Sequence, residues 1–363
     1  MSRVSTPLSE KLGLRLPLIA APMAGGPTTP ELVAASSAAG ALGSFGFAYT
    51  QPDEMRRQAA LVRAKTDKPF GINLFVSPQP GPIDPASQKS ALEAVAGYYR
   101  EMNLGKAEPV KAPYVPDLEA QFQAIEEIRP RVFTVHLGGL TREQVKRFQS
   151  KGMLVGGSAN CVAEAKGLEA AGFDFVIAQG GEAGGHRGSY LRDPYRSLTG
   201  TLALTRMIVA AVKLPVVAAG GIMDGAAIAA ALALGAQAAQ LGTAFIPCPE
   251  SGAAQVHKDL LVKSTEDDTG ITEKFSGKPA RGIVNRFMKE MVDRPTLAFP
   301  AQNAVTGKLR QASAKAGKPD FIALWAGQAM PLARALPAAE LIARLDAETQ
   351  QALQHLKGLI HET

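Results

Sequence analysis

Short apolar runs of strand length alternate with helical patterns along the first two thirds of the chain. Eight such runs can be counted, at 16–21, 41–46, 68–76, 131–138, 152–159, 173–180, 214–222 and 236–245. Most are continuously apolar, as parallel strands covered on both faces are. An open doubly wound sheet is the alternative, but eight equivalent units in this length favour a closed (β/α)8 barrel, the TIM barrel of the α/β class.

Helical patterns separate these runs. Thr29 is placed to cap a helix whose first residue is Pro30, and a second helix is expected over 52–64. A short polar-faced helix is predicted over 141–150. Gly172 is placed to end an amphipathic helix that begins near 161, and an alanine-rich helix follows at 224–235.

Two regions interrupt the barrel rhythm. Residues 77–115 form an insertion after the third strand that is rich in proline at both ends, and residues 247–310 follow the eighth strand. Both leave the carboxyl end of a strand, so both are expected to cover that face as lids. We therefore predict a barrel over 1–246 with the insertion, a smaller and mostly helical lid and substrate-binding region over 247–310, and C-terminal helices over 311–363 that pack back on the barrel.

Composition and charge narrow the class of protein. The chain is 46% hydrophobic and 20% charged, and its formal net charge of +6 is spread along the sequence. This favours a soluble protein that binds small anions and gives no support to nucleic-acid binding. Cys161 and Cys248 make no metal-ligand spacing with the five histidines, so we expect reduced thiols, no metal site and a cytoplasmic location. No run reaches the length of a membrane span.

The barrel interpretation places the candidate chemistry, because active sites of such barrels lie in the loops after the strands. The residues that this rule brings to one face are Pro22, Met23, Ala24, Asn73, His136, Gln179, His186 and the segments "AAGGI" and "AQLGT". In the last two segments, Gly220 and Gly221 let backbone N–H groups approach a phosphate, and Thr243 adds a hydroxyl. Glycines in tight turns also serve packing alone, but both loops together favour a phosphate-bearing ligand.

His186 stands in the glycine-rich stretch "AQGGEAGGHRG". A histidine in such a loop is often only solvated, but Gly184 and Gly185 leave room for a flat ligand, which favours catalysis or ligand contact. His136 is open between a substrate contact and a hydrogen-bonded core residue. Glu182 and Arg187 are interpreted as ion partners that fix the loop.

These segments, with "LPLIAAPMAGGPTTPELVAASSAAGALGSFG", "KPFGINLF" and "FSGKPARGIVNRFM", resemble class I of the nitronate monooxygenase family over essentially the whole chain. The resemblance implies a barrel that binds FMN and oxidises alkyl nitronates, notably propionate 3-nitronate, with molecular oxygen to a carbonyl compound and nitrite. Such a reaction detoxifies nitro compounds. The protein is expected to be a monomer or homodimer that binds neither membrane nor nucleic acid.

The resemblance also implies roles for residues. Pro22, Met23 and Ala24 would border the flavin ring, and Asn73 and Gln179 would bond its polar edge. The ribityl phosphate would be held by Gly184, Gly220, Gly221, Gln240, Leu241, Gly242 and Thr243. His186 would be the catalytic histidine, with His136 and Phe299 at the substrate. The segment "FPAQN" departs from relatives that have tyrosines nearby, since this chain has Phe299 and Ala304.

Two other functions stay open from the residues. An NADH-dependent FMN reductase of the enoyl-acyl-carrier-protein reductase type shares a similar "EAGGH" loop. A non-redox barrel isomerase or lyase would use the same phosphate loops for a phosphorylated substrate.

Overall fold

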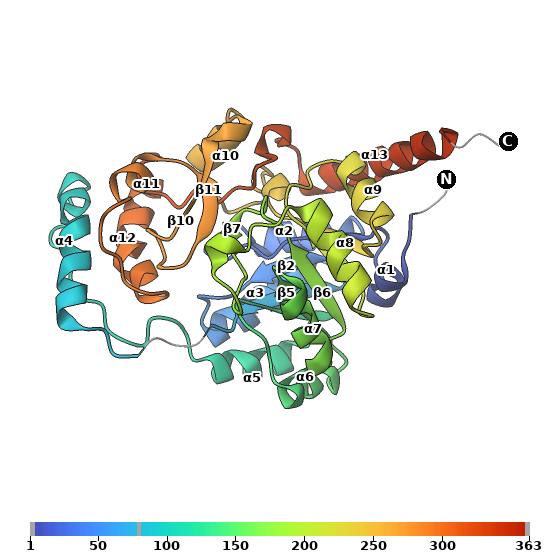
Figure 1. Ribbon diagram of the computed structural model, residues 1–363, viewed down its shortest axis with the longest axis horizontal. Coiled ribbons are helices and arrows are strands. Elements are labelled where there is room, and N and C mark those ends of the chain that lie inside the picture. The colour runs from blue at the N-terminus through green and yellow to red at the C-terminus, as the bar shows by residue number, and fades with distance from the viewer. Residues whose placement is uncertain (1–3, 78–80, 360–363) are drawn as a thin grey trace.

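The computed structural model describes residues 4–77 and 81–359, so residues 78–80 of the predicted insertion and 360–363 of the predicted tail lie outside it. Eight parallel strands form one sheet in the order β1-β9-β8-β6-β5-β4-β3-β2. A bridge between Ile19 and Leu42 joins β1 to β2 and closes the sheet. The prediction of a (β/α)8 barrel is confirmed (Figure 1).

The barrel strands are shorter than the apolar runs that predict them. They are β1 (Leu18–Ala20), β2 (Gly43–Gly46), β3 (Phe70–Phe75), β4 (Val132–His136), β5 (Leu154–Ala159), β6 (Phe175–Gln179), β8 (Val216–Ala219) and β9 (Ala238–Leu241). The run at 236–245 is the clearest difference, because Thr243–Phe245 form a 3₁₀ turn and not strand. Hydrophobicity marks burial, and burial continues past the last ladder hydrogen bond.

Helices cover the outside of the barrel and begin where local signals predict. The Thr29 hydroxyl accepts from the Leu32 N–H, and Pro30 is the first helical residue. Gly172, with φ 88°, ends the helix after β5. The helices on the barrel are α1 (Pro7–Leu12), α2 (Pro30–Ala38), α3 (Pro52–Lys65), α5 (Leu118–Ile128), α6 (Arg142–Gln149), α7 (Val162–Ala171), α8 (Thr201–Ala211) and α9 (Gly225–Ala233).

A second body of structure gathers around a three-stranded antiparallel sheet, β10 (Thr269–Thr272), β11 (Ala280–Ile283) and β7 (Gly185–His186). Its helices are α10 (Gln255–Leu261), α11 (Arg286–Glu290) and α12 (Ala301–Lys315). The insertion supplies α4 (Pro85–Glu101), which packs on α12 and shares a buried cluster with α11 and α12 (Figure 1). The predicted boundary at residue 310 falls inside α12.

One long helix, α13 (Ala338–Gly358), follows this region and packs on α9 and α2 of the barrel. Leu341, Ile342 and Leu345 join Ile228 and Ala231 in one buried cluster. The tail therefore contributes to the barrel's outer layer as a single helix within the described residues.

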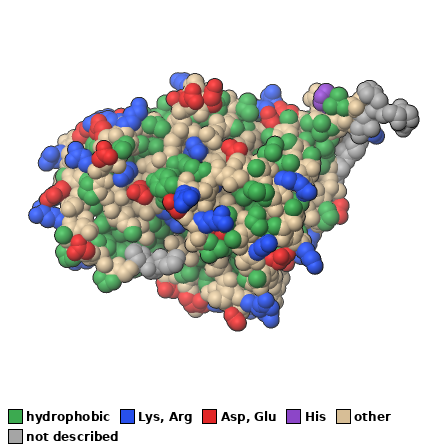
Figure 2. Space-filling model, in the orientation of Figure 1, with side chains coloured by type: hydrophobic (Ala, Val, Ile, Leu, Met, Phe, Trp, Pro, Cys, Tyr) green, Lys and Arg blue, Asp and Glu red, His purple; other side chains and the backbone are tan. Residues whose placement is uncertain are grey.

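One face of the molecule is mixed in charge. On the face shown in Figure 2, basic and acidic side chains are interspersed and no large field of one sign is present. None of the described helices is both long and apolar enough to cross a membrane.

Candidate functional site

His186 is held in place by a strand pairing. Although His186 lies in the glycine-rich loop after β6, it pairs with Ala280 of β11, and Gly185 pairs with Arg281. The His186 carbonyl accepts from Gln179 Nε2 at 2.9 Å and lies 3.1 Å from His136 Nε2. Its own Nε2 lies 2.9 Å from Ser276 Oγ. His186 is therefore a fixed, half-buried residue of the barrel mouth and not a solvated loop histidine.

Aromatic rings surround the His186 imidazole. The ring centroids of Phe75, Phe299 and Trp325 lie 5.5, 5.7 and 5.7 Å from it. Phe299 is among the residues predicted from the sequence, whereas Phe75, Trp325 and Ser276 are not. The first two stand within apolar runs where an aromatic residue reads as core, so the sequence offers no signal that separates them from packing residues.

Burial keeps both histidines of this site neutral. Desolvation, followed by the smaller electrostatic effects of His136, Lys278 and Arg310, lowers the pKa of His186 to about 3. Desolvation also lowers the pKa of His136 to about 4. At neutral pH the site thus presents two uncharged imidazoles, each able to donate from one nitrogen and accept at the other.

His136 supports the loop that carries His186. Its Nδ1 is hydrogen-bonded to Ser158 Oγ, and its Nε2 faces the His186 carbonyl. Both ring nitrogens are therefore engaged by the protein, which fits the hydrogen-bonded alternative of the sequence analysis. Its ring also contacts Phe75, at 5.5 Å between centroids, and a contact with substrate remains a prediction.

A buried polar network lies beneath the loop. Arg187 is fully buried and donates to the carbonyls of Gly180, Gln179 and Ser197 at 2.6, 3.2 and 3.0 Å. Glu164, also fully buried, accepts from the N–H groups of Asn160, Tyr190 and Leu191 and from Ser189 Oγ. These bonds satisfy the backbone of a loop that has no regular structure of its own.

The predicted ion pair between Glu182 and Arg187 is wrong. In the described chain no salt bridge joins them, and Glu182 instead accepts from the N–H and hydroxyl of Thr201 at the start of α8. Both residues do fix the loop, but Arg187 does so through backbone carbonyls and Glu182 through a helix N-terminus, where a carboxylate is favourable.

The loops predicted to hold a phosphate meet at the same mouth. Gly220 and Gly221 follow β8 with φ of 120° and 66°, and Gly242 and Thr243 follow the adjacent β9. Within the part of the chain that the structure describes, the N–H groups of Gly221 and Thr243 donate to no protein acceptor. All four residues are half-buried. Unpaired N–H groups on two neighbouring loops fit a phosphate group.

The other predicted cofactor residues differ in whether their side chains are already hydrogen-bonded within the protein. Four of them are half-buried at strand ends, so part of their surface can contact a ligand: Pro22, Met23, Ala24 and Gln240. Asn73 Nδ2 donates to Thr134 Oγ1 at 2.9 Å. Gln179 is committed to the loop, because its Oε1 accepts from Gly188 N and Asn160 Nδ2 while its Nε2 donates to His186.

Two more of these residues have protein neighbours that explain them. Leu241 is 1% exposed, so its side chain belongs to the core and only its backbone can face a ligand. A Cβ on Gly184 would lie 2.6 Å from the Ala326 carbonyl carbon. This glycine is therefore required by the close approach of the chain's own 326–327 segment.

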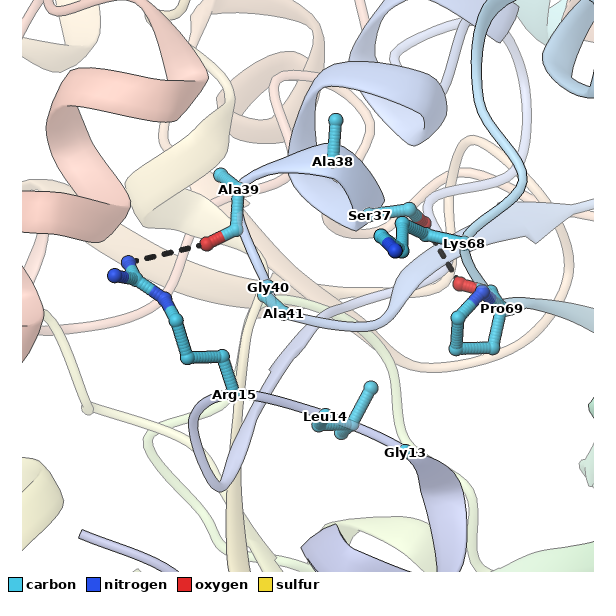
Figure 3. Close-up of a pocket in the computed structure, with 10 residues that line it drawn as sticks. All are labelled: Gly13, Leu14, Arg15, Ser37, Ala38, Ala39, Gly40, Ala41, Lys68 and Pro69. Carbon is cyan, nitrogen blue, oxygen red and sulfur yellow. Dashed lines mark hydrogen bonds between the residues drawn. The ribbon is translucent and has the colours of Figure 1, made fainter. Parts of the chain in front are cut away.

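A surface hollow at the other end of the barrel is separate from this site. Arg15, Ser37, Gly40 and Lys68 line it, and they all precede strands β1 to β3, so the hollow lies at the amino ends (Figure 3). Arg15 donates to the Ala39 carbonyl there. Catalytic groups of this fold gather at the opposite face.

The two thiols are free, as the sequence predicts. Cys161 and Cys248 are both buried and free. Among residues 4–77 and 81–359, no cluster of His, Cys, Asp or Glu side chains is arranged to hold a metal ion.

The neutral buried histidines make stability depend on pH. The pKa values of His136, His186 and His257 are lowered to about 4, 3 and 4 by desolvation, against about 6.5 in an unfolded chain. The unfolded state therefore binds more protons as pH falls below about 6.5. The stabilisation that these neutral histidines provide is fully present above that pH. It is lost as the pH falls to about 4, by roughly 3 kcal/mol for each histidine.

We expect urea unfolding at pH 7.5 and 5 to show this loss, and His257→Leu to reduce it. His257 is the residue of choice because its Nε2 is buried and has no partner among the described residues. The exposed His355 supplies the control, His355→Leu, which should leave the pH dependence unchanged. An equally steep dependence in His257→Leu would contradict the assignment.

Comparison with known proteins places this geometry in a family. A family model described as nitronate monooxygenase matches residues 5–348. The nitronate monooxygenase of Pseudomonas aeruginosa is 42% identical over 339 residues, which is 92% of this chain and 96% of that protein. The nitronate monooxygenase of Paraburkholderia phytofirmans is 40% identical over 353 residues, 95% of each chain.

Solved structures agree in fold. A structure described as nitroalkane oxidase from Streptomyces ansochromogenes superposes with a TM-score of 0.88 at 38% identity and covers 97% of this chain and 100% of its own. FabK from Thermotoga maritima has a TM-score of 0.77 at 28% identity, covering 98% and 100%. With matches of this length and identity, the chain belongs to the nitronate monooxygenase family, whose members are flavin-dependent oxidoreductases.

Proposed function

We propose that this enzyme binds FMN and uses molecular oxygen to oxidise alkyl nitronates, propionate 3-nitronate among them, to a carbonyl compound and nitrite. The observation that carries the proposal is the neutral His186, fixed between aromatic rings beside two loops with unpaired N–H groups. We further propose that it works as a detoxifying enzyme of the cytoplasm, as a monomer or homodimer.

The residues present fit FMN. Gly221 and Thr243 offer N–H groups for its terminal phosphate, and the half-buried Pro22–Ala24 segment after β1 offers surface to its ring. When bound, the flavin supplies the electron-transfer chemistry, so the protein need not supply a redox group of its own.

The chain's own residues bind and orient the substrate. A nitronate is already an anion, so its oxidation needs no base, only a donor to the nitro oxygens, which neutral His186 can supply from one ring nitrogen. Phe75, Phe299 and Trp325 exclude water around that donor and strengthen its hydrogen bond. A neutral nitroalkane would require more, because its α-carbon must first lose a proton to a base such as the second nitrogen.

The test is an oxygen-uptake assay with propionate 3-nitronate, together with the absorption spectrum and the mass of the released cofactor. We expect a yellow protein, FMN, and stoichiometric nitrite. Release of FAD would contradict the cofactor. Rapid anaerobic bleaching by NADH without nitronate oxidation would favour the flavin reductase, which the likeness to FabK keeps as the second candidate. A colourless protein would favour the non-redox barrel.

The phosphate loop gives a sharper test of the cofactor site. We expect Gly221→Val to weaken FMN binding by more than about tenfold, because the side chain blocks close approach of a phosphate and the loss of a hydrogen bond to a charged group is of that size. Valine at φ 66° also strains the backbone.

A matched control separates strain from cofactor loss. Gly152, with φ 84°, lies at the amino end of β5, and no atom of the described chain lies within 4 Å of an added Cβ. Gly152→Val should lower the midpoint of thermal unfolding comparably and keep its FMN. Equal flavin content in the two variants would show that Gly221 serves packing only.

A further inference from the structure

Three of the barrel helices carry at most one charged residue. These are α2, with Glu31, α8, with Arg206, and α9, with none. The other helices on the barrel carry at least two charged residues each. α13 packs on α2 and α9 and covers them. α8 packs inward on β6 and β8, but its outward side chains are exposed, so no element of the described chain covers that face.

Large hydrophobic side chains gather on this uncovered side. Eleven are exposed among the described residues, and five of them fall between residues 191 and 207: Leu191, Tyr195, Leu198, Leu202 and Met207. We call these five the α8 surface, since they lie on α8 and on the loop before it. Hydrophobic side chains gather over this segment in Figure 2. Single exposed hydrophobic residues are ordinary, but a group of them in one place marks an interaction site.

The charged residues of the same segment are of the kind that interfaces favour. Residues 191–210 contain Arg192, Asp193, Arg196 and Arg206, and neither lysine nor glutamate. Protein interfaces are enriched in arginine, tyrosine and methionine and depleted in lysine and glutamate. One reason is that a guanidinium is less strongly hydrated than an ammonium group and can stack on an aromatic ring. The composition therefore indicates a face that is buried in an assembly.

The size of the α8 surface suits a second protein chain. Its side chains belong to residues that are 39–67% exposed, which corresponds to roughly 500 Å² of largely apolar surface. A standard interface takes about 800 Å² from each partner, and about 60% of that area is non-polar. The two apolar areas are therefore about equal.

We propose that the α8 surface is where two copies of this chain associate as a two-fold dimer. In such a dimer the same patch meets itself, so one uncovered helix on each copy covers the other. Ala203 and Ala210 lie exposed beside Leu202 and Met207, and their small side chains let a second helix approach closely. The proposed reaction needs only a nitronate and oxygen, so no other protein is required, and a second copy is the occupant.

The mass of the full chain in solution tests the proposal, by size-exclusion chromatography with light scattering. We expect the wild type at micromolar concentration to have twice the 38.0 kDa of one chain. Leu202→Lys should raise the dimer Kd at least 100-fold, because the change occurs twice across a two-fold axis and puts a charge at an apolar contact. Val292, 60% exposed after α11, supplies the control: Val292→Lys adds the same charge and should remain a dimer.

The response to salt gives a second measurement. Three arginines and one aspartate leave each copy of the segment 191–210 with a net charge of +2, so the two copies repel each other while their apolar side chains hold them together. Because salt screens that repulsion, the Kd should fall severalfold between about 50 mM and 500 mM NaCl. A dimer that dissociates as salt rises would be held by charge pairs and would contradict the assignment.

A third measurement remains valid if Leu202→Lys does not fold. The thiol introduced by Leu202→Cys should be alkylated at least tenfold more slowly at a concentration where the protein is a dimer than after dilution to the monomer. The thiol introduced by Val292→Cys should react equally fast at both concentrations. Cys161 and Cys248 are buried, so they do not obscure the result.

The outcomes are independent of the chemistry. A wild type that stays monomeric at micromolar concentration, or a dimer that survives Leu202→Lys unchanged, would overturn the inference and leave nitronate oxidation untouched. Conversely, a wild type that dimerises through this surface but takes up no oxygen with nitronates would support the interface while the proposed function fails.

Discussion

His186→Asn is expected to retain FMN and to lose activity on a neutral nitroalkane far more than on the preformed nitronate. Deprotonation of carbon needs a base, whose contribution is roughly 10²–10⁴-fold. Oxidation of the anion needs a donor, and the asparagine amide replaces the imidazole N–H in part, so a loss below about tenfold is expected there. Burial lowers the pKa of His186, so the resting imidazole is neutral at neutral pH and gains a positive charge only when it accepts the substrate's proton.

The measurement is kcat/KM for both forms of one substrate, each at a pH where that form persists, with flavin content determined in parallel. His355→Asn, on the exposed surface of α13, controls for the substitution itself. Equal losses on the two forms would reject the base role and leave His186 as a binding residue. Loss of the flavin would instead mean that the residue belongs to the cofactor site.

Arg187→Met is expected to have the largest effect on stability, a loss of about 3 kcal/mol in the free energy of unfolding. The guanidinium is fully buried, and burial lowers its pKa to about 10. It donates to three carbonyls, at Gly180, Gln179 and Ser197. The first two also accept from the Ala183 N–H and from Asn160 Nδ2, so only the Ser197 carbonyl would lack a donor among the described residues. Methionine fills the space and spares the desolvation of a charge, but the Ser197 carbonyl left without a donor costs about 1–3 kcal/mol, and each of the other two lost bonds costs about 1 kcal/mol.

Urea unfolding measures this loss, and Arg196→Met serves as its control. Arg196 stands in the same loop with an exposed side chain, so its replacement should change the free energy of unfolding by no more than about 0.5 kcal/mol. A matching small effect of Arg187→Met would show that the loop finds other donors, water included, once the guanidinium is gone.

Features that depend on near neighbours in the chain could be predicted from the sequence. The eight strands and their closure follow from apolar runs at regular spacing. The start of α2 follows from Thr29 and Pro30 alone, because a capping hydroxyl and a preset backbone angle act over three residues. The placement of His186 at the barrel mouth followed from the same rule that active sites lie after the strands.

Features that depend on residues distant in the chain could not be predicted from the sequence. Gly185 and His186 form a strand only because Ala280 and Arg281 lie beside them, and no local pattern in two residues indicates that. Phe75, Ser276 and Trp325 reach His186 from three separate segments, and an aromatic residue at the end of a buried run looks like core until its neighbours are known. The prediction of a Glu182–Arg187 ion pair was wrong because opposite charges in one loop do not indicate which backbone groups need hydrogen-bond partners.

The short pairing between β7 and β11 means that two separate parts of the chain position the candidate catalytic histidine. The barrel encodes the residue, but the region after residue 246 supplies the strand partner and the serine that fix its orientation. A fragment ending at 246 would keep His186 in its sequence and lose its alignment. When the region after residue 246 is exchanged between barrels to alter substrate choice, the two-residue pairing of β7 with β11 must therefore be preserved. Both strands of that pairing must be present in the exchanged protein.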